Sequence, residues 1–201
     1  MIRVLLAEDQ DMVRGAIAAL LSLEPDIQIV AQVDRGDTVL EQALEHRPDV
    51  ALVDIEMPGR DGIDAAAELH RDFPECRVLI LTTFGRPGLM RRAMAAGASG
   101  FMLKDARADE LAVAIRRTAA GERVVDPQLA AQALSEGESP LSPREAEVLA
   151  ASSDGSSVIE VAARLHLSEG TVRNYLSAVI QKLNARNRAD AARIARVKGW
   201  L

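Results

Sequence analysis

The chain has 201 residues, enough for one large domain or for two small ones that each bury a workable core. Hydrophobic residues make up 48% and charged residues 27%, which is typical of a globular protein, and the aromatic content of only 2% argues against an aromatic platform for single-stranded nucleic acid. The net charge of −6 is uneven: residues 141–201 carry nine basic and six acidic side chains, and the remainder carries fifteen and twenty-four, so a basic C-terminal part suited to a polyanion follows an acidic part.

The start of the chain and its single cysteine bear on the compartment. Glu8 and Asp9 follow the first apolar run too closely for a signal-peptide core, and the sequence has no run of eighteen apolar residues. Cys76 is the only cysteine and cannot close an intrachain disulfide, which fits a reducing compartment. We therefore expect a soluble, cytoplasmic protein that does not associate with a membrane.

Residues 1–120 alternate short aliphatic runs with segments of helical periodicity. The aliphatic runs cover residues 2–7, 27–33, 50–53, 77–81 and 100–103, and the helical segments cover 12–22, 38–46, 63–72, 89–96 and 110–119. Five strand–helix repeats predict an α/β domain with a doubly wound, five-stranded parallel sheet and helices on both faces, a flavodoxin-like arrangement.

A linker and a second domain follow. The alternation stops at Gly121, and residues 121–140 are typical of a linker, with a short helix expected over 128–134. Residues 141–201 show helical patterns only. Ser142 and Ser157 each stand three residues before a glutamate and predict capping boxes, and further helices are expected from Ser168 and over 188–197.

Polar side chains follow four of the five predicted strands. Glu8 and Asp9 come after the first strand, Asp54 follows the third, Thr82 the fourth and Lys104 the fifth. Because parallel strands end at the same edge of a sheet, these side chains are expected to lie together. Three neighbouring carboxylates repel one another unless a hard cation such as Mg²⁺ lies among them, and a lysine with a hydroxyl suits the oxygens of an added phosphoryl group.

The motifs LLAED, LVDIEMPG, LTT and LKD carry this constellation, and over residues 1–120 they resemble the receiver domain of two-component response regulators. The resemblance implies that Asp54 accepts a phosphoryl group from a histidine kinase. It implies four Mg²⁺ ligands, which are Glu8, Asp9, Asp54 and the backbone carbonyl of Glu56. It also implies that Thr82 and Lys104 contact the phosphoryl oxygens and that Phe101 is the aromatic switch residue.

The helix expected over about 168–184 has two distinct faces. Apolar residues recur at helical spacing and are expected to pack inward, namely Val172, Leu176, Val179, Ile180 and Leu183. Arg173, Asn174 and Ser177 point away from this stripe. In the second helix of a helix-turn-helix, an exposed Arg and Asn can reach guanine and adenine edges in a major groove.

The segments LSPREAEVL, LSEGTVRNYL and KLNARNR resemble the LuxR-type helix-turn-helix of the NarL/FixJ family over about residues 139–201. The resemblance implies base contacts by Arg173, Asn174 and Ser177, phosphate contacts by Ser168, Thr171 and Lys182, and a dimer surface on the last helix. Val158 and Ile159 depart from the family, which usually has a polar or basic pair there, and Tyr175 replaces a common His. TTFGRPG together with VRNY also resembles a subgroup that includes regulators of membrane-lipid desaturation.

These residues favour one function over two others. The favoured function is a transcriptional regulator, not an enzyme, that a histidine kinase phosphorylates at Asp54 and that then forms a homodimer on double-stranded DNA. An orphan regulator that binds DNA without phosphorylation is disfavoured because Asp54, Thr82 and Lys104 are all present. A flavodoxin-like enzyme or cofactor carrier is disfavoured because the chain has neither a phosphate-binding glycine loop nor aromatic residues placed to enclose a flavin.

Overall fold

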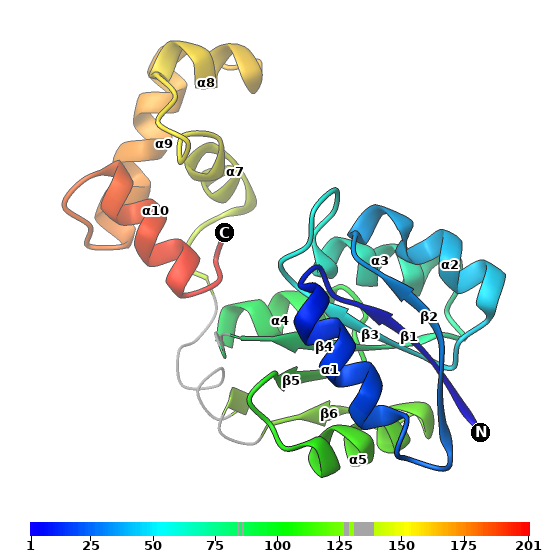
Figure 1. Ribbon diagram of the computed structural model, residues 1–201. Helices are drawn as coiled ribbons and strands as arrows, with labels where there is room; N and C mark the ends of the chain where they lie inside the picture. Colours follow the sequence, from blue (N-terminus) through cyan, green and yellow to red (C-terminus); the bar gives the residue numbers. More distant parts are fainter. Residues whose placement is uncertain (84, 86, 127–128, 131–138) are drawn as a thin grey trace. The chain divides into compact units, whose positions relative to one another are not determined.

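The computed structural model describes residues 1–83, 85, 87–126, 129–130 and 139–201 (Figure 1). The chain divides into two compact units, the first within residues 1–131 and the second largely within 132–201. Among the described residues, none of the helices is both long enough and apolar enough to cross a membrane. The two units are described in turn.

The first unit is built on a parallel sheet of six strands in the order β2-β1-β3-β4-β5-β6. The strands are β1 (Ile2–Ala7), β2 (Ile27–Val33), β3 (Val50–Asp54), β4 (Arg77–Thr82), β5 (Gly100–Leu103) and β6 (Val124–Val125). Every residue of β3 is buried, and Arg77 is the only exposed residue of β4. This burial on both faces is what the continuously apolar runs predict.

Helices cover both faces of the sheet. They are α1 (Asp11–Leu21), η1 (Gly36–Thr38), α2 (Val39–His46), α3 (Gly62–Asp72), α4 (Pro87–Ala95) and α5 (Ala108–Ala119). Helices α1 and α5 contact each other on one face, and α2 and α3 contact each other on the other (Figure 1). One core cluster joins the sheet to α1 and α5 and includes Leu6, Leu52, Leu79 and Ile115.

The sheet has one strand more than the five that the sequence predicted. Strand β6 lies in the segment predicted as a linker, where the Val124 N–H group donates to the Ser99 carbonyl oxygen at 3.1 Å. Two residues are too few to produce the period of a strand, so this strand could not be recognised from the pattern. Most of the short helix expected over 128–134 lies outside the described residues.

The described part of the second unit contains the helices α7 (Pro143–Ala151), α8 (Val158–Arg164), α9 (Glu169–Lys182) and α10 (Arg188–Val197). The capping boxes predicted at Ser142 and Ser157 are present, and the Ser168 side chain accepts a hydrogen bond from the Thr171 N–H group. The turn between α8 and α9 is tight enough to place His166 at φ 53°. Helix α9 contacts α7, α8 and α10 and is therefore the centre of this unit.

Candidate phosphorylation site and DNA-binding surface

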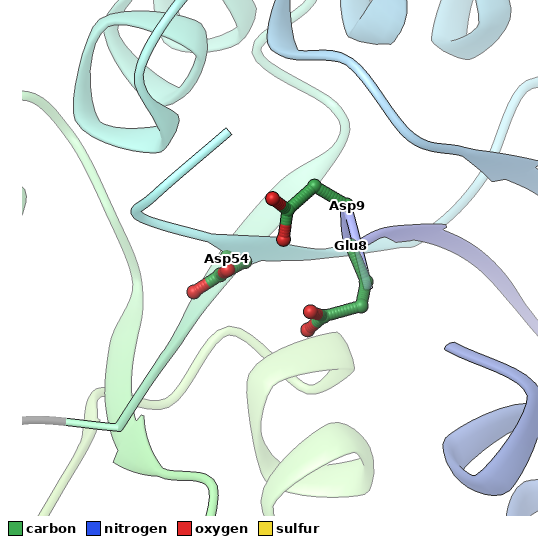
Figure 2. A group of neighbouring side chains, drawn as sticks. All are labelled: Glu8, Asp9 and Asp54. Atoms are coloured by element: carbon green, nitrogen blue, oxygen red, sulfur yellow. The ribbon is translucent and has the colours of Figure 1, made fainter. Parts of the chain in front are cut away.

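Three carboxylates meet at the carboxyl edge of the sheet. Strands β1 and β3 pair in register with Ala7 opposite Val53, so Glu8 and Asp9 end up beside Asp54. One oxygen of each side chain lies within 4.8 Å of one oxygen of the other two, and Figure 2 shows the three groups around a common space. Glu8 and Asp54 are buried, whereas Asp9 is exposed. The arrangement can hold a hard divalent cation through oxygen ligands.

Lys104 joins the acidic cluster from the end of β5. Its Nζ atom lies 2.6 Å from Glu8 Oε2 and 2.9 Å from Asp54 Oδ2. Burial opposes the charged form of Lys104, but the hydrogen bonds that its ammonium group donates to Glu8 and Asp54 outweigh this effect and raise the lysine pKa. The ammonium group is thus held in its charged form beside the two buried carboxylates.

Asp54 is a desolvated carboxylate. Only 4% of the residue is exposed. This burial raises the pKa of Asp54 and is the largest influence on it, whereas the Lys104 ammonium group acts in the opposite direction. A desolvated carboxylate depends on neighbouring positive charge, and the Lys104 ammonium group supplies it at 2.9 Å from Asp54 Oδ2.

Thr82 and Phe101 lie on neighbouring strands close to Lys104. The Lys104 N–H group donates to the Thr82 carbonyl oxygen at 2.8 Å, which fixes the end of β5 against the end of β4. Thr82 is buried, and so is Phe101, which pairs with Ile80 on β4 and with Val125 on β6. The structure therefore places Thr82 at the edge of the sheet that holds the carboxylates, whereas Phe101 lies within β5, two residues before its end.

The loop after Asp54 is held against β3 by a glycine. The Gly62 N–H group donates to the Ile55 carbonyl oxygen at 2.9 Å. A Cβ atom on Gly62 would lie 1.9 Å from the Asp54 carbonyl oxygen, a distance that no side chain tolerates. The intervening Glu56 is exposed. The first residue of α3 thus sets the position of the backbone that carries Asp54.

Arg14 supports the acidic cluster and was not predicted. Its Nη1 group donates to the Glu8 carbonyl oxygen at 2.6 Å, and its Nη2 group pairs with Asp11. Arg14 lies on α1, and its backbone N–H group donates to the Gln10 carbonyl oxygen one helical turn earlier. The spacing from Glu8 gives no sign of this contact, because it depends on how α1 leaves the end of β1.

In the second unit, α9 has the two faces that its sequence predicts. Val172, Leu176, Val179 and Leu183 are buried and Ile180 packs partly against the same core. Arg173, Asn174 and Ser177 are exposed. An exposed polar stripe near the start of the second helix of a helix-turn-helix is the geometry that reads a major groove.

Both cationic side chains of α9 form ion pairs that the sequence interpretation missed. The Arg173 Nη2 atom lies 2.7 Å from Glu169 Oε2, and the Lys182 Nζ atom lies 2.7 Å from Glu145 Oε2. The spacing of four residues between Glu169 and Arg173 is a usable signal for the first pair. The second joins residues 37 positions apart and requires the packing of α7 against α9.

Comparison with known proteins decides the family. Residues 4–116 match the response regulator receiver domain, and residues 139–195 match the luxR family of bacterial regulatory proteins. The chain is a LuxR-type response regulator. It is similar to two Bacillus subtilis proteins: the uncharacterized transcriptional regulatory protein YvfU (47% identity, 100% of both chains) and the transcriptional regulatory protein DesR (43%, 100% of this chain and 99% of DesR).

A solved relative supports the same assignment. The response regulator ChrA of a heme-sensing two-component system is 35% identical, with a TM-score of 0.60 over 100% of this regulator and 98% of ChrA. The NarL/FixJ assignment, the α/β receiver followed by a helical domain, and the exclusion of an enzyme are thereby confirmed. The regulator belongs to a family of phosphorylation-dependent, DNA-binding transcription factors.

The regulator departs from its family at the start of α8. Ile159 is 64% exposed and Val158 packs partly against the core of the unit. Tyr175, which replaces a common His, packs partly against the same core. The Ile159 side chain has no group that can form a hydrogen bond to a phosphate.

Proposed function

We propose that Asp54 is the residue that a histidine kinase phosphorylates. The observation that carries this proposal is the convergence of Asp54, Glu8, Asp9 and the Lys104 ammonium group at one edge of the sheet. Lys104 supplies positive charge beside an Asp54 oxygen, which would favour the approach of an anionic donor and stabilise the oxygens that it delivers.

The donor set fits Mg²⁺. Three carboxylates with oxygens within 4.8 Å of one another are hard ligands, and the backbone carbonyl of Glu56 is proposed as a fourth. The bound ion would neutralise charge between donor and acceptor. Glu8, Asp9 and Asp54 would hold the ion, and of the three only Asp9 is exposed to solvent.

The signal would leave the pocket through two strand ends. Phosphorylation adds about −1.5 to −2 charge at Asp54. Thr82 and Lys104 would bind the new oxygens, and Phe101, which lies on β5 three residues before Lys104, would change its packing. Thr82 and Phe101 are buried, so a change in their packing would be passed on to the residues around them. The resulting change of the receiver surface would promote a homodimer.

The dimer would place two second units on double-stranded DNA. Arg173, Asn174 and Ser177 are proposed to contact bases, and phosphate contacts are proposed for the remaining predicted residues Ser168, Thr171 and Lys182. Arg173 and Lys182 would exchange their carboxylate partners for DNA on binding. In this proposal residues 1–120 are the receiver, 121–140 the linker and 141–201 the DNA-binding domain.

Intact-mass measurement after treatment with acetyl phosphate tests the acceptor. Wild type is expected to gain one phosphoryl group only when Mg²⁺ is present, and Asp54→Ala is expected to gain none. Asp64→Ala removes an exposed aspartate from the nearby helix α3 and serves as the control that stays fully labelled. Full labelling of Asp54→Ala would refute the assignment.

DNA binding with and without the phosphodonor tests the coupling. The phosphorylated protein is expected to bind its operator more tightly, because linked half-sites gain from effective concentration. Equal affinity in both states, with Asp54 labelled, would instead favour the regulator that acts without phosphorylation.

A further inference from the structure

A cavity lies at the edge of the sheet opposite to Asp54. It has a volume of about 310 Å³, and its lining comes from the amino ends of β4 and β5, the ends of α3 and α4, and the turn after α5. Arg77, the first residue of β4, lines it, whereas Thr82, the last residue of β4, lies at the phosphorylation site. The cavity is thus separated from that site by the length of a strand.

The lining is cationic. Arg77 and Arg123 supply the positive charge, and none of the lining residues, which include His70, is an aspartate or a glutamate. Within the part of the chain that the structure describes, neither guanidinium group forms an ion pair or a side-chain hydrogen bond. The nearby Asp49 carboxylate accepts a hydrogen bond from the Arg3 N–H group at 2.8 Å and is not part of the lining. Two forked donors are therefore available to an incoming anion.

Two glycines in left-handed conformation shape the walls. Gly97 has φ +95°, and a Cβ atom there would lie 2.3 Å from the Cγ atom of His70. Gly121 has φ +85°, and a Cβ atom there would lie 3.7 Å from an Arg77 Nη atom. The His70 imidazole therefore packs directly over the bare backbone of Gly97, whereas the Arg77 guanidinium group lies at ordinary van der Waals distance from the Cβ position of Gly121.

The remaining polar groups favour an organic ligand over a bare ion. Met94 and Ala95 of the last turn of α4 line the cavity. The Met94 carbonyl oxygen already accepts a hydrogen bond from the Gly97 N–H group at 3.2 Å, which leaves the Ala95 carbonyl at the end of the helix as the acceptor. The Cys76 thiol is also in the lining, but burial raises its pKa to about 12, so it contributes neither charge nor a nucleophile. The guanidinium groups can donate hydrogen bonds to an oxyanion, and the carbonyl group at the end of α4 can accept one from a hydroxyl group. The lining therefore suits a molecule that carries both.

We propose that this cavity binds a small hydroxylated organic anion through its phosphate or carboxylate group. Arg77 and Arg123 bind the oxyanion, and the end of α4 accepts hydrogen bonds from the hydroxyl groups. The volume is near the lower end of the range for small-molecule sites, which limits the ligand to a compact molecule. The alternative is a purely structural role, in which the cations only offset the partial negative charge at the carboxyl ends of the helices, and the test separates ligand binding from this role.

The test is an NMR titration of the full chain without Mg²⁺, at constant ionic strength. Glycerol 3-phosphate and citrate are the probes, with glycerol and inorganic phosphate as the arms that carry only hydroxyl groups or only the oxyanion. The amide signals of Ser99 and Gly121 are expected to shift and saturate with at least one of the two probes, and more tightly than with either arm. The identity of the tighter probe distinguishes phosphate from carboxylate.

Matched variants make the result specific. Arg77→Gln with Arg123→Gln is expected to weaken binding at least about tenfold, since hydrogen bonds to charged groups are lost. Arg71→Gln removes the same charge from an exposed side chain that pairs with Asp72, and is expected to bind within about twofold of wild type. If the double variant fails to fold, Arg123→Gln alone repeats the comparison in a turn. Shifts that fail to saturate, or that are equal in both variants, would leave only the structural role of these cations and overturn the proposal.

Discussion

Substituting Gly62 by Ala should damage the acceptor strand by a measurable amount. The added Cβ atom would lie 1.9 Å from the Asp54 carbonyl oxygen and 2.8 Å from its carbonyl carbon, so β3 and the start of α3 must separate by roughly 1 Å. Overpacking of this kind costs about 1–3 kcal/mol in the free energy of unfolding. A displacement of about 1 Å in a reacting group can slow a reaction by about 100-fold, and we expect phosphorylation of Asp54 to slow by about 10- to 100-fold.

Gly15→Ala is the matched control. Nothing lies within 4 Å of a Cβ atom on Gly15, which is an exposed residue of α1. Alanine there should raise the free energy of unfolding by about 0.5–1 kcal/mol, because glycine is the poorer helix former, and should leave phosphorylation unchanged.

Urea unfolding followed by circular dichroism measures the stabilities of both variants, and acetyl phosphate labelling followed by mass spectrometry measures the rates. The only tryptophan, Trp200, packs in the second unit, so its fluorescence reports whether that unit is unaffected. Wild-type stability and rate in Gly62→Ala would refute the close packing of α3 on the acceptor backbone.

Three further outcomes are expected. Arg116→Ala should raise the Asp26 pKa from about 2 toward 3.8, as measured by NMR titration, because the hydrogen bond from Arg116 is the largest cause of the lowered pKa. In wild type this pair stabilises the fold above about pH 4, and the stabilisation is lost between about pH 4 and 2; the variant should lack this pH dependence. Thr82→Ala should still be phosphorylated but should dimerise poorly in sedimentation velocity, and a dimer as stable as wild type would exclude Thr82 as the responder. Lys182→Ala should lower the salt slope of DNA binding by about one without changing base preference. Arg173→Ala should weaken the free energy of operator binding by about 1–3 kcal/mol and relax base preference. The reverse pattern would refute the orientation of α9.

The sequence predicted most of the first unit because its signals are local. The aliphatic runs lie within one residue of the observed strand bounds, and Asp54, Thr82 and Lys104 meet because parallel strands end at one edge. The capping serines predicted the start of α7 and α8 for the same reason: a cap is set by residues three positions apart.

The missed features depend on tertiary structure. Arg14 reaches the Glu8 carbonyl only because of the direction in which α1 leaves the sheet, and Lys182 reaches Glu145 only because α7 packs on α9. Helical spacing placed Lys182 on α9 but could not show that one of its hydrogen bonds is already used. The same argument applies to β6, whose two residues are a strand only because β5 lies beside them.

The short strand β6 also bears on how the receiver is best isolated. An uncovered strand edge presents unpaired N–H and C=O groups and invites pairing between molecules, and a very short outermost strand reduces this hazard. A fragment that stops at residue 120 would remove Val124 and Val125 and leave the Gly100–Phe101 edge of β5 open. A fragment that continues through Asp126 keeps that edge covered and should stay soluble at concentrations at which the shorter one aggregates.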